Sequence, residues 1–356
     1  MGTIDRGHSK SWQDEAKSAI KKEMLGYIKS YDPSYYKNIT AYIDRGGHYT
    51  RPLLFLAAAK AFGAEEKEIV KMAATIEMSE EAILIFDDLQ DHSLLRRGGP
   101  TLNSAYGYEI ASNYAAILED ATRRIFEDYL LSLNDKDVAV RLKAKFDEIA
   151  GITAYGQYLE LEFTHIIKDP SKVDESYYYN IVKGKTAAYS LYGPIDFAAI
   201  IAKQNDEVIK AIEDIGMHAG IAFQIHDDLL DVLASERLGK ERFGDLYEGK
   251  YTLIIAHAYD SACKKDKALI KRIYAKSREE KDDSDIAELL RIIKATGSLQ
   301  YALAKRDDEM RSAIALIGKY AGILPSNEYS IKLMQDILGV IARDPIDIMS
   351  LLRNYE

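Results

Sequence analysis

Two short acidic motifs contain the residues of this sequence best suited to chemistry. The first, DDLQD, runs from Asp87 to Asp91, and the second, DDLLD, runs from Asp227 to Asp231. Residues four apart lie on one face of a helix, so each motif would direct two carboxylates to one point. Clustered carboxylates repel one another unless they are protonated or bind a cation. Because oxygen ligands suit a hard ion, the two motifs predict Mg²⁺ binding.

The sequence beside each motif helps to separate metal binding from a simpler interpretation, a solvated helix end. An apolar stretch precedes each motif, at residues 83–86 and 221–225. Acidic pairs are common, so one such motif alone would leave both interpretations open. Two copies, far apart in the sequence and each beside an apolar stretch, favour a metal site, because a buried charge needs a partner.

Cationic residues near the motifs are suited to the anion that such a metal would recruit. Arg96 and Arg97 follow the first motif and precede a Gly-Gly-Pro break, and guanidinium groups bind phosphate oxygens in pairs. A lysine taken singly is more often solvent-facing, so the other cations gain meaning only beside the carboxylates. These lie in a glycine-rich turn at residues 46–52, at residues 183–186, and at Lys240 and Lys250.

Long helices must position these residues, because helix breakers are few and widely spaced. Gly and Pro are absent between Lys67 and Asp91, where apolar residues recur at steps of three and four, and residues 208–232 read in the same way. With no run of short alternating strands, this predicts an all-α bundle of about ten helices. No shift in composition marks a boundary, so we expect a single domain over residues 1–356. Breaks are predicted at residues 46–47, 63, 98–100, 134–135, 169–170, 193–194, 239, 281–284 and 325.

Composition argues against several other classes of protein. The formal net charge is −10, which disfavours a protein that wraps duplex nucleic acid but not one that binds a small anion through metal ions. Cys263 is the only cysteine, so a disulfide within the chain and a thiolate metal cluster are excluded. No apolar stretch approaches the roughly 20 residues that span a bilayer, and the polar N-terminus lacks a signal-peptide core. We therefore expect a cytoplasmic protein.

The order of these motifs resembles that of the trans-polyprenyl diphosphate synthases, the family of farnesyl and geranylgeranyl diphosphate synthases. The similarity covers roughly residues 42–250 and includes a GGxxxRP turn, DDxxD followed by RRGGPT, a Gly-Gln pair, KTA, FQxxDDxxD, and a final run of GK, GD and GK. The resemblance implies an isoprenoid-synthase bundle around a deep central apolar cavity, a homodimer, three Mg²⁺ ions, and isopentenyl and allylic diphosphates as substrates.

Family roles carry over onto the matching positions. The resemblance implies that the metal ligands are Asp87, Asp91, Asp227, Asp231 and Glu160, with Asp245 in support. It implies that the substrate-binding residues are Gly47, His48, Arg51, Glu80, Arg96, Arg97, Gln157, Lys185, Thr186, Gln224, Lys240 and Lys250. Those expected to act directly in catalysis are Arg96, Lys185, Thr186 and Gln224.

Three positions depart from the family's pattern. His48 stands where a lysine that binds isopentenyl diphosphate is usual, and Glu80 stands where His or Gln is usual. An anion beside a diphosphate is unfavourable unless it is protonated or paired, so Glu80 could offset the change by holding His48 as an imidazolium. Glu160 replaces a usual Asp, which keeps the chemistry of a Mg²⁺ ligand but changes its reach.

The resemblance also implies a mechanism and a product length. Metal ions and cationic side chains would stabilise the diphosphate as the allylic C–O bond breaks, the homoallylic double bond would attack the cation, and proton loss would follow. In the family, bulky residues four or five positions before the first motif stop the product at fifteen carbons. Here Ile83 and Ala82 hold those positions, with Ser79 one turn deeper, so we expect geranylgeranyl diphosphate or a longer polyprenyl diphosphate.

Three alternatives stay open at this point. A class I terpene cyclase also uses an aspartate motif and a helical fold, but it binds one diphosphate and needs neither the turn at residues 46–51 nor the arginine pair. A non-catalytic subunit of a heteromeric synthase would keep the fold and lose carboxylates, whereas both motifs are intact here. A plain helical scaffold would leave the paired motifs unexplained.

Overall fold

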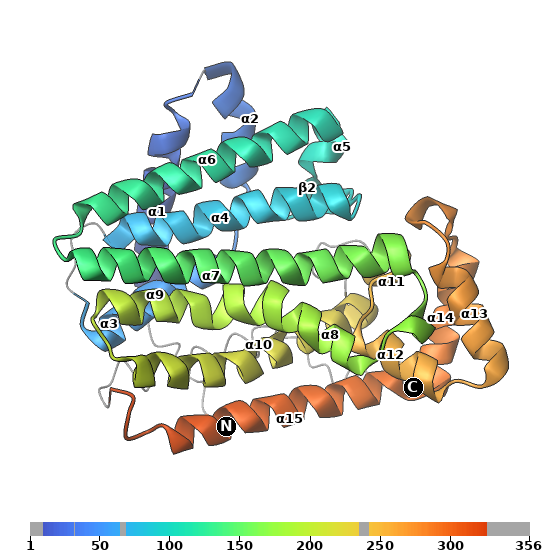
Figure 1. The fold of residues 1–356 in the computed structure, drawn as a ribbon. Coiled ribbons are helices and arrows are strands. Elements are labelled where there is room, and N and C mark those ends of the chain that lie inside the picture. The colour runs from blue at the N-terminus through green and yellow to red at the C-terminus, as the bar shows by residue number, and fades with distance from the viewer. Residues whose placement is uncertain (1–9, 32, 65–68, 235–241, 326–356) are drawn as a thin grey trace. The chain divides into compact units, whose positions relative to one another are not determined.

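Helices account for nearly all regular structure in this protein, as Figure 1 shows. The computed structural model describes residues 10–31, 33–64, 69–234 and 242–325. Within these residues the strands form one two-stranded antiparallel hairpin, in which Leu95 pairs with Pro100 and Arg96 with Gly99. The predicted all-α class is therefore confirmed. The described helices outnumber the ten expected, because the chain also forms very short helices such as α5 and α11, of five residues each.

The chain divides into two compact units, which we call the first and the second unit. The described part of the first unit lies within residues 10–148, 190–213 and 319–325, and that of the second within residues 149–189, 214–234 and 242–318. Both units are helical. The single domain that the sequence predicts stays a prediction, as does the deep apolar cavity.

The first unit is built around one long buried helix, α4. Its elements are α1 (Lys10–Ile28), α2 (Pro33–Asp44), α3 (Thr50–Phe62), α4 (Ile69–Gln90), β1 (Leu95–Arg96), β2 (Gly99–Pro100), α5 (Leu102–Tyr106), α6 (Tyr108–Ser132) and α9 (Gly193–Ile201). Figure 1 shows α6 lying along α4, and α1 and α3 also pack against α4. Met72, Met78 and Ile85 of α4 are fully buried, so the apolar periodicity read from the sequence faces a core.

The second unit has its own apolar core, which includes Phe163, Ile225, Leu229 and Tyr251. Two helices, α7 (Lys136–Leu161) and α10 (Asp206–Ala234), begin in the first unit and end in the second. The helix predicted over residues 208–232 is thus confirmed. The other elements of this unit are η1 (Glu162–Ile167), η2 (Pro170–Lys172), α8 (Glu175–Val182), η3 (Lys183–Tyr192) up to residue 189, α11 (Gly244–Glu248), α12 (Leu253–Ser261), α13 (Lys264–Tyr274), η5 (Arg278–Glu280), α14 (Asp283–Ala295) and α15 (Ser298–Lys319) up to residue 318.

The predicted break at residues 193–194 is wrong. α8, the π-helix η3 and α9 follow one another without interruption, and Pro194 lies in the first turn of α9. In a π-helix each N–H bonds to a carbonyl one residue further back than in an α-helix, and π-turns are frequent at functional sites. A proline is tolerated where one hydrogen-bonding pattern gives way to another, because its missing N–H costs least at a helix start.

None of the described helices is both long and apolar enough to cross a bilayer.

Candidate active site

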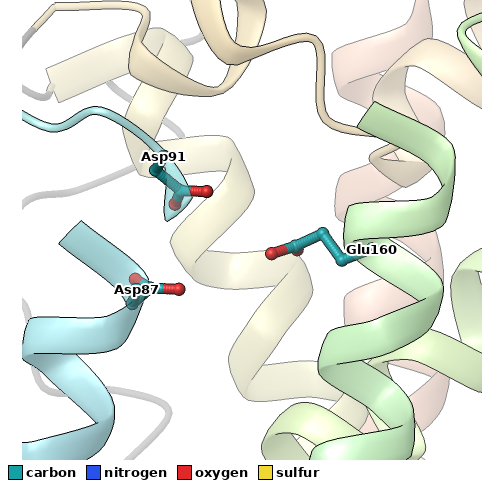
Figure 2. A group of neighbouring side chains, drawn as sticks. All are labelled: Asp87, Asp91 and Glu160. Carbon is teal, nitrogen blue, oxygen red and sulfur yellow. The ribbon is translucent and has the colours of Figure 1, made fainter. Parts of the chain in front are cut away.

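The first aspartate motif ends α4 in the first unit. The Asp91 N–H donates to the Asp87 carbonyl at 2.9 Å, so the helical turn continues just past the end of the helix. One carboxylate oxygen of Asp87 and one of Asp91 therefore lie within 4.8 Å of each other. Figure 2 shows these two side chains and that of Glu160, which projects from α7. Carboxylate oxygens are the kind of ligand that a hard divalent cation prefers, so this pair can serve as ligands of such an ion.

Asp88, the middle one of the three aspartates in this motif, is held by an arginine. Arg96 donates from Nε to Asp88 at 2.6 Å and from Nη2 to Asp87 at 3.3 Å. Burial raises the pKa of Asp88 to about 6, while the charge of Arg96 and its hydrogen bond act in the opposite direction. Arg96 thus fixes the motif through a charged hydrogen bond in a largely buried setting.

Arg97 is held by a different carboxylate of α4. Its Nη1 donates to both oxygens of Glu81, at 2.9 and 3.1 Å, and the Glu81 side chain is fully buried. Burial raises the pKa of Glu81 to about 7, and the charge of Arg97 opposes this shift. A Cβ added at Gly47 would lie 2.8 Å from Arg97 Nη2, so the glycine at this position makes room for the guanidinium group.

Arg51, the second residue of α3, is the third predicted substrate-binding arginine of the first unit. It donates to Glu80 at 2.6 Å and to the Ser190 hydroxyl at 2.7 Å. The partner of Glu80 is therefore Arg51, whereas the sequence suggested His48, whose side chain is exposed. Glu80 keeps its charge compensated through an arginine that is itself predicted to bind a diphosphate.

Close helix contacts position the residues of the second unit. A Cβ added at Gly156 of α7 would lie 2.3 Å from the Lys185 backbone nitrogen, and one added at Gly184 would lie 2.7 Å from the Ile152 carbonyl oxygen. A Cβ at Gly220 of α10 would lie 2.5 Å from Ala187. Gly220, which lies within the helical pattern of residues 208–232, is thus required for α10 to approach η3. Glycine allows helix backbones to approach more closely than any other residue.

These contacts bring predicted site residues of the second unit together. Lys185 of η3 forms an ion pair with Glu160 of α7, each only partly exposed. The Thr186 hydroxyl donates to the Gln224 side-chain carbonyl at 2.7 Å. Gln157 lies one residue after the close contact at Gly156, on the same helix.

The second aspartate motif lies on α10. Asp228, the middle one of its three aspartates, accepts from the Gln224 amide nitrogen and from the Tyr178 hydroxyl, both at 2.8 Å. Burial and the charge of Asp245 raise the pKa of Asp228, whereas these two hydrogen bonds act to lower it. Asp231 accepts from the Asp245 backbone N–H at 3.2 Å. The turn that contains Asp245 is thereby tied to the motif.

The two remaining predicted lysines and the predicted length-determining residues lie in different surroundings. Lys250 pairs with Glu248 at 2.8 Å and lies 3.7 Å from Asp245. Lys240 lies outside the described residues. Ala82 of α4 is buried, and its neighbours in the predicted length-determining set, Ser79 and Ile83, are half-buried.

Sequence reasoning missed three residues that hold the site together. Tyr178 anchors Asp228, Glu81 anchors Arg97, and Ser190 binds Arg51. Only Glu81 left a signal, because it is a charged residue within the helical apolar pattern that leads to the first motif, just before the stretch at residues 83–86. A buried charge of that kind ordinarily marks an ion pair. Tyr178 and Ser190 are ordinary helix residues in sequence, and only their positions in space reveal the contacts.

Comparison with known proteins decides the family. A model of the family described as polyprenyl synthetase matches residues 32–293. The chain belongs to this family. The matched residues include both aspartate motifs and the arginine pair. Family membership confirms the resemblance read from the sequence and, with it, the predicted class of enzyme, a transferase.

Individual relatives agree with this assignment. The chain is 31% identical over 270 residues to a geranylgeranyl diphosphate synthase of Methanosarcina mazei, which covers 75% of this chain and 78% of the relative. It is 31% identical over 279 residues to the octaprenyl diphosphate synthase of Escherichia coli, covering 77% and 80%. A crystal structure of geranylgeranyl pyrophosphate synthase from Corynebacterium glutamicum, complexed with isoprenyl diphosphate and magnesium, matches with a TM-score of 0.81 at 22% identity, covering 93% of this chain and 99% of that one. The structural likeness supports the isoprenyl-synthase fold.

Proposed function

We propose that this member of the polyprenyl synthetase family is a Mg²⁺-dependent trans-prenyltransferase. It condenses isopentenyl diphosphate with an allylic diphosphate and releases geranylgeranyl diphosphate or a longer polyprenyl diphosphate. The observation that carries the proposal is that each aspartate motif lies on a helix and is fixed by neighbouring side chains, in a chain whose relatives are named for this product class. A homodimer is proposed on the resemblance alone.

The donor set fits a hard divalent cation. The proposed ligands are Asp87, Asp91, Asp227, Asp231 and Glu160, all of which offer carboxylate oxygens. The Asp87 and Asp91 oxygens, within 4.8 Å of each other, are close enough to approach one ion from the same helix end. Bound Mg²⁺, for which three ions are proposed, would neutralise the diphosphate and so make it a better leaving group.

The chain's own residues would do the rest. Arg96 and Lys185 donate to the allylic diphosphate, and both are already oriented by the carboxylates Asp88 and Glu160. Arg51 and Arg97 bind isopentenyl diphosphate, together with Gly47 and His48. Such preorganised cations act most strongly where water is excluded, because charge interactions grow as the local dielectric falls.

Thr186 and Gln224 are proposed to stabilise the allylic cation with oxygen lone pairs. Their hydrogen bond of 2.7 Å fixes both side chains before substrate arrives. Gln157 is proposed to line the same apolar space. Excluding water there protects the cation from being quenched, and no protein nucleophile is needed.

Product length is proposed to depend on the side chains that precede the first motif on α4. Ala82 and Ser79 are small and Ile83 is of medium size, which supports the proposal of a product of twenty carbons or more. An Ala82→Phe substitution adds a ring at a buried position and should shorten the product.

The deciding experiment is chromatography of products made from labelled isopentenyl diphosphate. Dimethylallyl, geranyl and farnesyl diphosphates are supplied as separate primers, with Mg²⁺ and with a chelator. The proposal predicts Mg²⁺-dependent growth to twenty carbons or more, and a shorter product from Ala82→Phe. A cyclic hydrocarbon would support a terpene cyclase, and no turnover would support a non-catalytic subunit. A wild-type product that stops at fifteen carbons would contradict the length assignment alone.

A further inference from the structure

A chain of hydrogen bonds links three helices of the second unit. It runs from the Tyr178 hydroxyl on α8 to Asp228 on α10, from Gln224 on α10 to the same carboxylate, and from Thr186 on η3 to Gln224. The three distances are 2.8, 2.8 and 2.7 Å. Tyr178, Asp228 and Thr186 are all buried, at 3%, 4% and 6% exposure. Buried networks of this kind specify one arrangement only when every member is satisfied.

The chain has a direction, and the carboxylate sets it. Both oxygens of Asp228 accept, one from Tyr178 and the other from the Gln224 amide nitrogen. Gln224 must therefore point its amide nitrogen at Asp228 and its carbonyl oxygen at Thr186. An amide side chain can be turned end for end with little change in shape, so this orientation is fixed by its partners rather than by packing.

The direction determines what Thr186 can offer to a ligand. A hydroxyl has one proton and two lone pairs. Because the Thr186 proton is given to Gln224, only its lone pairs are available to other groups. Lone pairs suit a positive charge, whereas a hydroxyl that kept its proton for donation would turn its positive end toward that charge.

We propose that Tyr178 is a positioning residue for the condensation reaction. It acts through Asp228 and Gln224. These two residues keep the Thr186 proton directed at the Gln224 carbonyl oxygen, so that the proton does not point at the reacting carbon. This inference rests on the proposed function, because it concerns the cation that the prenyltransferase reaction creates. Tyr178 touches neither substrate nor metal in this assignment, and its effect is transmitted through the chain of hydrogen bonds.

Loss of the Tyr178 hydroxyl would leave one oxygen of Asp228 buried without a donor. The carboxylate would then turn its unpaired oxygen toward the Gln224 amide nitrogen, which would shift the Gln224 side chain, break its hydrogen bond with Thr186 and leave Thr186 free to donate elsewhere. The expected effect is on the chemical step, because the diphosphate-binding cations Arg96 and Lys185 have other partners and keep them.

The test measures single-turnover condensation with saturating substrates for Tyr178→Phe, Thr186→Val and the double variant. Tyr178→Phe should lower the rate about 10-fold and change the KM of each diphosphate less than about 3-fold. In the Thr186→Val background the same substitution should lower the rate less than about 2-fold, because the hydroxyl it controls is gone. Equal losses in both backgrounds would overturn the proposal.

Tyr301→Phe provides a matched control. Tyr301 also donates to a carboxylate at an end of α8, Glu175 at 2.6 Å, but that carboxylate is outside the chain of hydrogen bonds. Its substitution should leave the single-turnover rate within about 2-fold of wild type. A 10-fold loss here would show that any loosening of α8 slows the reaction, and would overturn the specific role of Tyr178.

A second variant decides the matter if Tyr178→Phe does not fold. 4-Aminophenylalanine at position 178 keeps the shape and a weaker N–H donor. It should lower the single-turnover rate about 3-fold with Thr186 present, and should have no effect in the Thr186→Val background. An equal effect in both backgrounds overturns the inference while leaving the proposed function intact. A wild-type protein that consumes no isopentenyl diphosphate overturns both.

Discussion

The middle aspartates of the two motifs are held in contrasting ways. Asp88, in the first unit, bonds to the charged guanidinium group of Arg96 at 2.6 Å. Asp228, in the second unit, bonds to the neutral side chains of Tyr178 and Gln224, both at 2.8 Å. The sequences around the two aspartates are nearly the same, so the difference comes from the elements that pack against each motif.

The contrast extends to the residues around each motif. In the first unit the arginines that could bind a diphosphate are already paired, Arg97 with Glu81 and Arg51 with Glu80. A diphosphate that binds there must compete with carboxylates of the protein. In the second unit Lys185 is also paired, with Glu160, but Thr186, Gln224 and Asp228 are held by donors without a charge, and close glycine contacts hold the helices together. In the proposed reaction, the arginines of the first unit would therefore exchange a protein carboxylate for a diphosphate. The side chains around Asp228 in the second unit would instead keep their partners.

The largest effect is expected when a substitution removes one carboxylate from either motif. Asp87→Asn and Asp227→Asn should each lower kcat by roughly 1,000-fold or more, because each removes a proposed metal ligand. Assays of isopentenyl diphosphate incorporation at several Mg²⁺ concentrations measure this. Asp308→Asn is the control, since Asp308 is an exposed residue paired with Arg311 on α15. If one motif variant keeps full activity, that motif has no part in the reaction.

The next largest effect is expected when a side chain is added at Gly156, where α7 lies against η3. Gly156→Ala places a Cβ 2.3 Å from the Lys185 backbone nitrogen, which forces α7 and η3 apart. We expect a loss of about 3 kcal/mol in the free energy of unfolding, measured by urea denaturation. Gly151→Ala on the same helix meets nothing within 4 Å and should be neutral or slightly stabilising. Similar losses for both would show that the close contact is unimportant.

Part of this contrast could be predicted from the sequence. The periodicity around each motif predicts α4 and α10, and the family motifs identify the carboxylates and arginines. Sequence could not predict that residues 183–192 form a π-helix, because a π-turn depends on tertiary packing rather than on residue type. It could not reveal the partner of Glu80 either, since Arg51 and His48 are near each other in sequence and only the fold decides between them.

Buried charge in the first unit should make stability depend on pH. Burial, then the charges of Glu81 and Glu80, raise the pKa of Glu77 to about 8 from its ordinary value of 4.5. The folded protein therefore holds a proton that the unfolded chain releases, and stability is lost as pH rises from 4.5 to about 8. Glu77→Gln should remove about 2 kcal/mol of this loss between pH 5 and pH 7.

Thermal or urea unfolding of both proteins across this pH range checks the prediction. An unchanged pH profile in the variant would show that Glu77 is ionised in the folded protein. The second unit offers a useful comparison, because Lys281, whose pKa burial lowers to about 8, acts with the opposite sign. Its cost to stability is present below pH 8 and disappears as pH rises toward the ordinary lysine value.

The smallest expected effect concerns the ion pair between Arg51 and Glu80. Glu80→Gln removes the carboxylate that competes for Arg51, so the KM for isopentenyl diphosphate should fall about 5-fold with little change in kcat. Raising the salt concentration should narrow the gap between the two proteins, because it screens the competing charges. A higher KM in the variant would mean that Glu80 orients Arg51 for the substrate instead of competing with it.

The proposed reaction requires that the carboxylates of both motifs bind divalent cations in the presence of a diphosphate. Electron paramagnetic resonance can follow Mn²⁺ binding to wild type, Asp91→Asn and Asp231→Asn, each with inorganic pyrophosphate. We predict that wild type binds Mn²⁺ and that each substitution weakens binding at least about 10-fold. Binding that is equally tight in all three proteins would contradict the account.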